Sequence, residues 1–494
     1  MKDKLALDTS QQLMFDRISA QTITARDQAI ASLAFIGLGV ANLLLELSCR
    51  AETRESQAGM VVVLAPAIAT NLGVALTQMG QADAGITHYR EAARLQPDYA
   101  EAHFNLGISH GDRKQHPEAI ACYERTLAIR PDYADALFNL GLILVHERRP
   151  AEAVVCLEQA ARLRPDNPEA HNNLSMALAD LGRFADAVSA CDEALKLRPQ
   201  DAKTHMNRGN ALSSLGRNDE AIACYNLALR LQPDYPNVRW NRSLAWLVMG
   251  DFERGWPEYE WRWKRSEAKI RNFPEPRWDG GDLSGKTILL WSEQGLGDIL
   301  QFVRYADVLK QRGATVWVEC PAKLTKLISL CRGVDRVFAE GEPLPAGFDS
   351  QAPLMSLPMA CGNKASDIPA GSYLLADENR VKDWRQRFGT SPQFKIGIAW
   401  QGNPKYRADR FRSLPLAHFA ALSAVPGVQL VSLQKGPGVE QLAREPFDVR
   451  TFGEDFDADG PFLDTAAVMM NLDLIVTSDS SIAHLAGALG RPTW

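Results

Sequence analysis

A proline recurs every 34 residues through the first half of this 494-residue chain. The series consists of Pro97, Pro131, Pro165, Pro199 and Pro233, and each of them closes a tripeptide that reads LQP, IRP or LRP. Proline cannot continue a helix, because it lacks an amide donor and its ring clashes with the preceding turn. A fixed period of this length predicts a stack of two-helix units, each of which contacts only its neighbours.

Small and aromatic residues keep the same phase as the prolines. The small residues of the first helix are Gly73, Gly107, Gly141, Ser175 and Gly209, and those of the second are Gly85, Ala119, Ala153, Ala187 and Ala221. We expect Tyr89, Tyr123 and Tyr225 to fill the space between units. The pattern is typical of tetratricopeptide (TPR) repeats. It predicts an α-solenoid of five full repeats over 66–99, 100–133, 134–167, 168–201 and 202–235, and a partial sixth that begins at Pro236.

One column of asparagines follows the repeat on its first helix. It consists of Asn71, Asn105, Asn139, Asn173, Asn207 and Asn241. An asparagine amide offers both a donor and an acceptor, so a row of them can pair with the backbone of an extended peptide. The column resembles the asparagine ladder of protein O-GlcNAc transferases, which implies a protein or peptide in the concave groove. The alternative is structural, because asparagine is common at this position of TPR repeats.

The net charge and the cysteines indicate which partners the protein binds and in which compartment it works. The formal net charge is −6, which is not the basic balance of a nucleic-acid-binding protein. The eight cysteines show no metal-ligand spacing, so we expect no metal site. Four of them recur in phase with the repeat and are expected as small buried apolar residues in a reducing, cytoplasmic compartment. They are Cys122, Cys156, Cys191 and Cys224.

The first 65 residues break the phase of the repeat and are expected to form a degenerate helical segment. Their apolar stretch, Ala29–Leu45, is slightly shorter than the roughly 20 residues that a membrane helix needs, and it contains polar residues. We expect a buried helix of a degenerate repeat there rather than a membrane span or a secretory signal.

An aromatic segment follows the repeats. Residues 236–270 are expected to cap the last apolar face of the solenoid, with Trp256, Tyr259, Trp261 and Trp263 as the packing residues. A sugar-binding aromatic platform is the alternative. Prolines and glycines at 271–286 predict a linker.

From Thr287 the chain alternates between apolar runs and helical segments. TILLWS, ATVWVEC and a run that starts at Arg336 are expected as strands, with helices at 299–312 and over AKLTKLISLC between them. A second series contains FKIGIAWQGN, VQLVSLQ and LDLIVTS. Strands that alternate with helices predict a parallel α/β fold. We expect two Rossmann-like halves, over 287–375 and 390–494.

Two strand-to-helix loops carry possible chemistry. Gly295, Gly297 and Asp298 form a GLGD turn after the first strand, where ligands bind in open α/β folds, or merely a turn that Asp298 caps. The second loop comes after the last strand and contains Asp479, Ser480, Ser481 and His484. Free amides at the start of a helix would bind a diphosphate there, and Asp479 would accept hydrogen bonds from sugar hydroxyls.

These motifs together resemble heptosyltransferase-like glycosyltransferases of bacteria, and the resemblance covers about 285–494. It rests on LGD, on IAWQGNPKYRADRFRSLPL and on TSDSSIAHLAGALGRP, in that order. The resemblance implies a GT-B fold, with the acceptor on the first half and a nucleotide-sugar on the second. Members of that family continue with a further strand and helix beyond the position of Trp494, so the second half is expected to be incomplete.

The resemblance also implies roles for individual residues. Asp298 would be the general base. The donor diphosphate would lie near Ser480, Ser481 and His484. Further donor contacts are expected from Gly295, Gly297, Lys405, Arg410, Arg412 and Asp479. No metal or cofactor is implied, because cationic side chains and helix N-termini neutralise the leaving diphosphate.

Three functions stay open at this point. The chain could be a glycosyltransferase whose solenoid presents a protein acceptor. It could transfer a sugar to a glycan or a lipid while the solenoid recruits partners. It could also be a non-catalytic TPR scaffold for protein–protein interactions with a degenerate glycosyltransferase domain, as the missing strand would favour.

Overall fold

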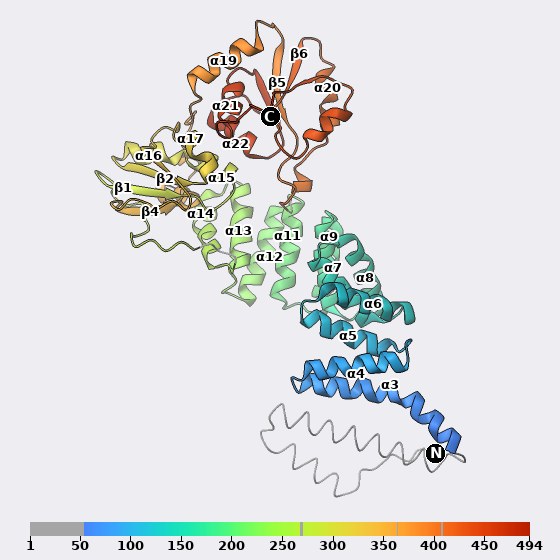
Figure 1. The fold of residues 1–494 in the computed structure, drawn as a ribbon. Helices are drawn as coiled ribbons and strands as arrows, with labels where there is room; N and C mark the ends of the chain where they lie inside the picture. Colours follow the sequence, from blue (N-terminus) through green and yellow to red (C-terminus); the bar gives the residue numbers. More distant parts are fainter. Residues whose placement is uncertain (1–53, 267–269, 363, 407–408) are drawn as a thin grey trace. The chain divides into compact units, whose positions relative to one another are not determined.

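The computed structural model describes residues 54–266, 270–362, 364–406 and 409–494. These residues divide after Leu231 into two compact units (Figure 1). The apolar stretch Ala29–Leu45 lies outside the described residues, as does most of the expected degenerate segment. Within the described part of the chain, every helix is too short or too polar to cross a membrane.

The first unit consists of antiparallel helix pairs (Figure 1). The pairs are α3 (Arg54–Gln78) with α4 (Ala82–Leu95), α5 (Ala100–Asp112) with α6 (His116–Ile129), α7 (Ala134–His146) with α8 (Pro150–Leu163), α9 (Pro168–Asp180) with α10 (Phe184–Leu197), and α11 (Ala202–Ser214) with α12 (Asn218–Leu231). Each second helix ends two residues before the recurring proline, because a proline disfavours helical geometry in the residue before it. The expected boundary between 65 and 66 falls inside α3, which contains Pro66.

The in-phase glycines and tyrosines pack against each other within a unit, and not between units as we expected. A Cβ added to Gly107 would lie 2.6 Å from Cε1 of Tyr123, and one added to Gly209 would lie 2.6 Å from Cε1 of Tyr225. Both tyrosines are buried. The ring therefore occupies the space that the missing side chain leaves between the two helices of one repeat.

The in-phase cysteines are only partly as expected. Cys191 and Cys224 are buried, whereas Cys122 and Cys156 are half-buried, and all four are free thiols.

The second unit begins with a helix pair that packs on its own α/β core. The pair is α13 (Pro236–Val248) and α14 (Phe252–Tyr259), followed by the 3₁₀ helix η1 (Glu260–Lys264). Tyr259 is 3% exposed within the apolar core that includes the sheet residues. Trp256 contacts Phe302 edge-on, with 5.8 Å between ring centroids. The expected capping segment thus belongs to the α/β unit.

The segment expected as a linker, 271–286, is also packed into this unit. Arg277 forms a parallel β-bridge with Gln351. The backbone amide of Trp278 donates to the carbonyl of Gln351 over 2.8 Å. Trp278 and Leu283 are buried. Burial of these apolar side chains holds the segment against the sheet, although the neighbouring prolines and glycines are typical of a linker.

Two four-stranded parallel sheets follow (Figure 1). Their strands are β1 (Thr287–Trp291), β2 (Thr315–Cys320), β3 (Arg336–Ala339) and β4 (Ser350–Pro353), then β5 (Phe394–Ala399), β6 (Val428–Ser432), β7 (Val449–Arg450) and β8 (Leu474–Thr477). The orders are β3-β2-β1-β4 and β7-β6-β5-β8, so both sheets have the same topology. At the end of the chain, the amide of Trp494 donates to the carbonyl of Ile475, beside β8.

Helices surround both sheets. They are α15 (Leu296–Phe302), α16 (Tyr305–Gln311), α17 (Thr325–Ile328), α18 (Leu357–Cys361), α19 (Glu378–Phe388), α20 (Ala420–Ser423), α21 (Leu463–Met469) and α22 (Ser481–Ala488). Short 3₁₀ turns lie between them: η2 (Ala322–Leu324), η3 (Leu354–Ser356), η4 (Ala365–Asp367), η5 (Asp409–Phe411), η6 (Leu416–Phe419) and η7 (Val439–Arg444). The single helix expected at 299–312 is broken between α15 and α16, where Arg304 Nε donates to the carbonyl of Gln301 over 2.9 Å. The helix expected over AKLTKLISLC is reduced to η2 and α17.

Both faces of β1 are buried, which explains its continuous apolar run. Ile288 and Leu290 belong to the large core of the unit. Leu289 packs on the other face with Trp317 and Phe348. The parallel sheet expected from TILLWS is therefore confirmed.

Candidate functional site

The predicted site residues come from loops at the carboxyl ends of the strands. In each sheet the strand order reverses at one point, between β1 and β4 and between β5 and β8. Ligands bind outside the carboxyl ends of the strands at such points. The GLGD loop follows β1, and the loop 478–480 follows β8.

The two motifs contact each other through Gly297 and His484. A Cβ added to Gly297 on α15 would lie 2.5 Å from Cδ2 and 3.1 Å from Nε2 of His484 on α22. The imidazole therefore packs directly on the glycine, and no larger residue fits there without moving it. Residues that are far apart in the sequence form one constellation.

Asp298 is the third residue of α15 and is half-buried. Its Oδ2 accepts a hydrogen bond from the amide of Gly295 over 3.0 Å, so it also has the structural role that we considered as the alternative. Burial raises the pKa of Asp298, as does the charge of Asp479, while the Gly295 amide and His484 oppose the shift. A carboxylate with a raised pKa is a stronger base than one on the surface.

His484 is half-buried beside this carboxylate. Burial lowers the pKa of His484, and the charge of Arg304 contributes in the same direction, against the charges of Asp298 and Asp479. A lowered pKa favours the neutral imidazole, which presents one donor and one acceptor. Asp479 is exposed at the same edge of the sheet.

The start of α22 carries the predicted serines. Ser480 is the N-cap, and its Oγ accepts from the amide of Ile482 over 3.4 Å. Ser481 is the first residue of the helix. Just before them, Ser478 Oγ is buried without a hydrogen-bond partner. The loop therefore combines helix-terminal amides with a polar atom that a ligand could satisfy.

Three of the predicted donor-binding residues are basic and lie on the loop that follows β5. Lys405 is exposed. Arg410 is also exposed, and its guanidinium lies 4.7 Å from the centroid of the Phe411 ring. Arg412 Nε donates to Oδ1 of the buried Asp409 over 3.2 Å. For the described residues, the contacts of these cations are local to their own loop.

Arg304 is a residue of the candidate site that the sequence did not point to. It lies close enough to His484 to lower the pKa of the imidazole. Its Nη2 donates to the hydroxyl of Tyr373 over 3.2 Å, and its guanidinium lies 4.8 Å from the centroid of that ring. The break between α15 and α16 places it there, and no local pattern in the sequence signals that break.

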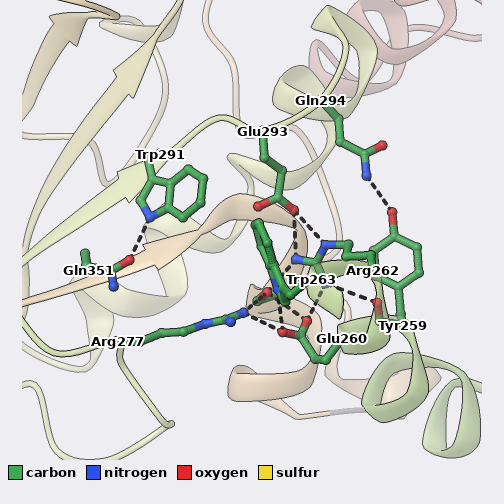
Figure 2. Close-up of polar contacts among 10 residues, drawn as sticks. Tyr259, Glu260, Arg262, Trp263, Arg277, Trp291, Glu293, Gln294 and Gln351 are labelled. Carbon is green, nitrogen blue, oxygen red and sulfur yellow. Dashed lines mark hydrogen bonds and ion pairs between the residues drawn. The ribbon is translucent and has the colours of Figure 1, made fainter. Parts of the chain in front are cut away.

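An ionic cluster, formed by Glu260, Arg262, Arg277, Glu293 and Ser356, lies at the carboxyl end of the first sheet, and Arg277 is its exposed member (Figure 2). Arg262 Nη2 donates to Glu293 Oε1 over 2.8 Å and to Ser356 Oγ over 2.7 Å. Arg262 Nη1 donates to Glu260 Oε1 over 2.6 Å. Arg262, which belongs to the aromatic segment, therefore binds Glu293 in the loop that leads to Asp298.

Glu293 is the unusual member of this ionic cluster. Its side chain is 5% exposed, and its Oε2 has no hydrogen-bond partner. Burial raises the pKa of Glu293 to about 7, although Arg262 opposes the shift. Trp263 packs under the guanidinium of Arg262 at 4.5 Å from the ring centroid, and its Nε1 donates to Glu260. These contacts support the packing interpretation of the aromatic segment.

In the first unit, successive first helices contact one another directly, which places them on the inner side of a curved array. Asn105 and Asn173 each donate Nδ2 to a carbonyl of their own helix over 2.8 Å, which leaves the amide oxygen and a second N–H. Asn139 is half-buried and Asn71 is exposed. Asn207 donates to Oδ1 of Asn172 over 2.9 Å. Asn241 lies on α13, in the second unit.

Asn172 is a buried polar residue that the sequence analysis did not single out. Its Oδ1 also accepts from Thr204 Oγ1 over 3.1 Å. It thus links two successive repeats through hydrogen bonds. Asn172 directly precedes Asn173, and only Asn173 belongs to the column of asparagines that repeats every 34 residues.

Comparison with known proteins identifies the first unit. Tetratricopeptide-repeat family models match residues 64–132, 106–178, 168–201 and 202–235. Protein FlbA of Caulobacter vibrioides is 28% identical over 273 residues, which cover 50% of this chain and 45% of that protein. The match therefore spans less than half the length of this relative.

Solved structures also resemble the chain. YrrB, described as a TPR protein with an unusual peptide-binding site, is 23% identical with a TM-score of 0.34, over 35% of this chain and 88% of that one. PilF of Pseudomonas aeruginosa is 20% identical with a TM-score of 0.35, over 41% and 91%. MamA is 21% identical with a TM-score of 0.32, over 33% and 94%. From the family models and the helix pairs, residues 64–235 are tetratricopeptide repeats, which are protein–protein interaction repeats.

Proposed function

We propose that this chain is a glycosyltransferase that uses a nucleotide-sugar and whose repeats bind a protein or peptide. The observation that carries the proposal is the packing of His484 on Gly297. It joins the loop after β1, with the half-buried carboxylate of Asp298, to the start of α22. A base beside a helix N-terminus, whose free amides can bind an anion, suits sugar transfer from a diphosphate.

The proposed reaction divides the work between the two halves. Asp298 accepts the proton of an acceptor hydroxyl on a protein or glycan. The acceptor oxygen then bonds to the anomeric carbon, and the bond from that carbon to the diphosphate breaks. The nucleoside diphosphate leaves with the electron pair. Ser480, Ser481, His484 and Arg304 supply donors and positive charge at the leaving group, so this route needs no metal.

Gly295, Gly297, Lys405, Arg410, Arg412 and Asp479 complete the proposed donor site. The glycines leave room for His484 and for Asp298 beside the proposed ligand. The arginines and the lysine lie on a loop at the same edge of the second sheet, and a diphosphate would attract them.

The second candidate is a TPR scaffold with a degenerate α/β domain. Two observations favour it. Asp298 already has a structural partner in the amide of Gly295. Arg412 is already paired with the buried Asp409. A domain of this kind would bind a partner without performing transfer.

Donor binding separates the two candidates. We expect one class among UDP-, GDP-, ADP- and dTDP-sugars to raise the melting temperature of the full chain, because a ligand that binds only the folded state stabilises it. Calorimetry with that donor should then show weaker binding for His484→Ala. If none of these donors binds the unmodified chain, the scaffold is the correct function.

A pair of glycine substitutions tests whether the contact of Gly297 with His484 contributes to donor binding. In Gly297→Ala, the new Cβ would displace His484, so donor affinity should fall by about tenfold or more, comparable with the loss of one charge-assisted hydrogen bond. Gly487→Ala, on the same helix as His484, is the matched control, because its Cβ would meet nothing within 4 Å. Equal donor affinity in the two variants would remove His484 from the site.

A further inference from the structure

Two histidines and a glutamate from neighbouring repeats converge in the first unit, away from the residues discussed above. His116 is the first residue of α6. His146 is the last residue of α7, and Glu147 is its C-cap. One ligand atom of each residue lies within 4.8 Å of the others. We propose that His116, His146 and Glu147 bind a divalent transition metal ion of the Zn²⁺ type.

The distances suit such an ion. His116 Nδ1 lies 2.9 Å from Glu147 Oε1, and His146 Nδ1 lies 3.4 Å from the same oxygen. Zinc bonds to nitrogen and oxygen are about 2.0–2.2 Å long in a tetrahedron, so neighbouring ligand atoms are about 3.3 Å apart. The two imidazoles are 4.5 Å apart between ring centroids. A small rotation of the exposed His146 would complete the arrangement.

His116 is the residue that most needs a partner. Its side chain is 15% exposed, and its Nδ1 is buried without a hydrogen bond despite the nearby carboxylate. A buried ring nitrogen that faces a carboxylate without a well-directed hydrogen bond recovers little of the hydration that it loses. A metal ion between Nδ1 and Glu147 Oε1 would satisfy both atoms.

The chemical types of the three ligands determine which metal ion they would bind. Two imidazoles and one carboxylate favour zinc and its transition-metal neighbours, whereas calcium and magnesium prefer oxygen ligands only. Three protein ligands leave a fourth position for water or another ligand. The nearby Arg149 donates to Glu152 over 2.7 Å, which offsets its charge near the site.

The backbone near the set is also distinctive. The solenoid loops place a residue with positive φ at Gly80, Gly182 and Gly216, and the equivalent residues of the two intervening loops are Lys114 and Arg148. Lys114 precedes His116 by two residues, and Arg148 follows Glu147 directly. Side chains at positive φ cost stability and often accompany functional sites. These two loops are the ones that carry the three proposed ligands.

A metal here would join two repeats. His116 belongs to the repeat of α5 and α6, and His146 and Glu147 belong to that of α7 and α8. Repeat arrays gain stability from the interfaces between neighbouring units. Binding only to the folded array would therefore raise its melting temperature.

The test is calorimetry of the full chain with Zn²⁺, in a buffer with a phosphine reductant. We expect one site that is lost in His116→Gln and in His146→Gln and weakened in Glu147→Gln. Loss of a ligand should weaken the site by more than about 100-fold, since loss of an outer partner alone costs 10–100-fold. Mg²⁺ should not compete for it.

His171→Gln is the matched control, because His171 is a half-buried histidine of another repeat whose Nε2 lies 3.1 Å from the carbonyl of Pro165. It should retain the zinc site. Zinc that binds to free cysteines would bind equally to all variants. Comparison of the variants with the wild type therefore removes its contribution. Equal zinc binding in the wild type, His116→Gln and His146→Gln would overturn the proposal, as would the absence of binding to the wild type. The His146 side chain is 72% exposed, so His146→Gln should fold even if His116→Gln does not.

Discussion

Glycine on the first helix of a repeat sets how closely the two helices of that repeat approach each other. The space above Gly107 is filled by the ring of Tyr123. A methyl group there would overlap the ring, and overpacking of a close contact costs about 1–3 kcal/mol.

Gly107→Ala should therefore lower the free energy of unfolding of the repeats by about 1–3 kcal/mol. Gly111→Ala is the control on the same helix, because its Cβ would meet only Ile143, at 3.8 Å. That variant should gain up to about 1 kcal/mol, since alanine is the better helix former. Urea unfolding followed by circular dichroism measures both. Equal effects of the two substitutions would refute this role of Gly107.

Glu293 makes the stability of the α/β unit depend on pH. Its pKa is raised from 4.5 to about 7 in the folded chain. Its contribution is therefore fully present below pH 4.5 and is lost as pH rises to about 7. Glu293→Gln cannot ionise and still offers an oxygen to Arg262.

The stability of Glu293→Gln relative to the wild type should thus increase between pH 5 and pH 8. A rise of 1–3 kcal/mol is the expected order, since one pKa unit corresponds to about 1.4 kcal/mol. Urea unfolding followed by tryptophan fluorescence at the two pH values gives the difference. Glu340→Gln, at an exposed position, should show no such rise. Parallel pH curves for Glu293→Gln and the wild type would exclude the buried, raised-pKa carboxyl.

At the scale of elements, the repeats were predictable and the α/β connections were only partly so. The prolines and glycines fixed the helix pairs because each acts locally, through backbone geometry or direct contact. β4 was missed because its SQAP sequence has no apolar run, although all four residues are buried. The break before Arg304 and the packing of Trp278 depend on contacts with distant segments, which no local pattern reports.

The positions of the two candidate-site loops could be predicted from the sequence, but the residues that they contact could not. GLGD and SDSSIAH could be placed after strands because strand-to-helix turns have a clear signature. The contact of Gly297 with His484 joins two separate sheets and is visible only in three dimensions. The same holds for the pairing of Arg262 with Glu293 and for the histidines of neighbouring repeats.

The asparagine column makes a prediction at the scale of the solenoid. Replacing Asn139 and Asn173 together by alanine should weaken the binding of an extended peptide by about 10–100-fold, because each lost hydrogen bond is worth about 0.5–1.5 kcal/mol and each amide can form two. Peptides selected by display against the full chain are the probes, and fluorescence polarisation gives the affinity.

Val155→Ala with Ser189→Ala is the control, because both residues are exposed on the second helices of the same repeats. Peptide affinity should be unchanged in this pair. If both double variants bind peptide as the wild type does, the column has only a structural role.

At the scale of the whole molecule, the chain combines an interaction array with an α/β unit of two similar halves. Each sheet has the same strand order, and their core is shared. The proposed division of labour is that the repeats bind a protein or peptide while the α/β unit performs transfer. The two proposed activities are assigned to separate units, so each can be tested while the other is kept intact.

Asp298→Asn tests the central claim most directly. The asparagine can still accept from the Gly295 amide, so the turn is preserved, but it cannot take a proton. We predict that binding of the nucleotide-sugar by calorimetry is unchanged, while release of the nucleoside diphosphate falls by about two to four orders of magnitude. Asp307→Asn, on the neighbouring helix α16, should retain both. Release at the wild-type rate in Asp298→Asn would contradict the account.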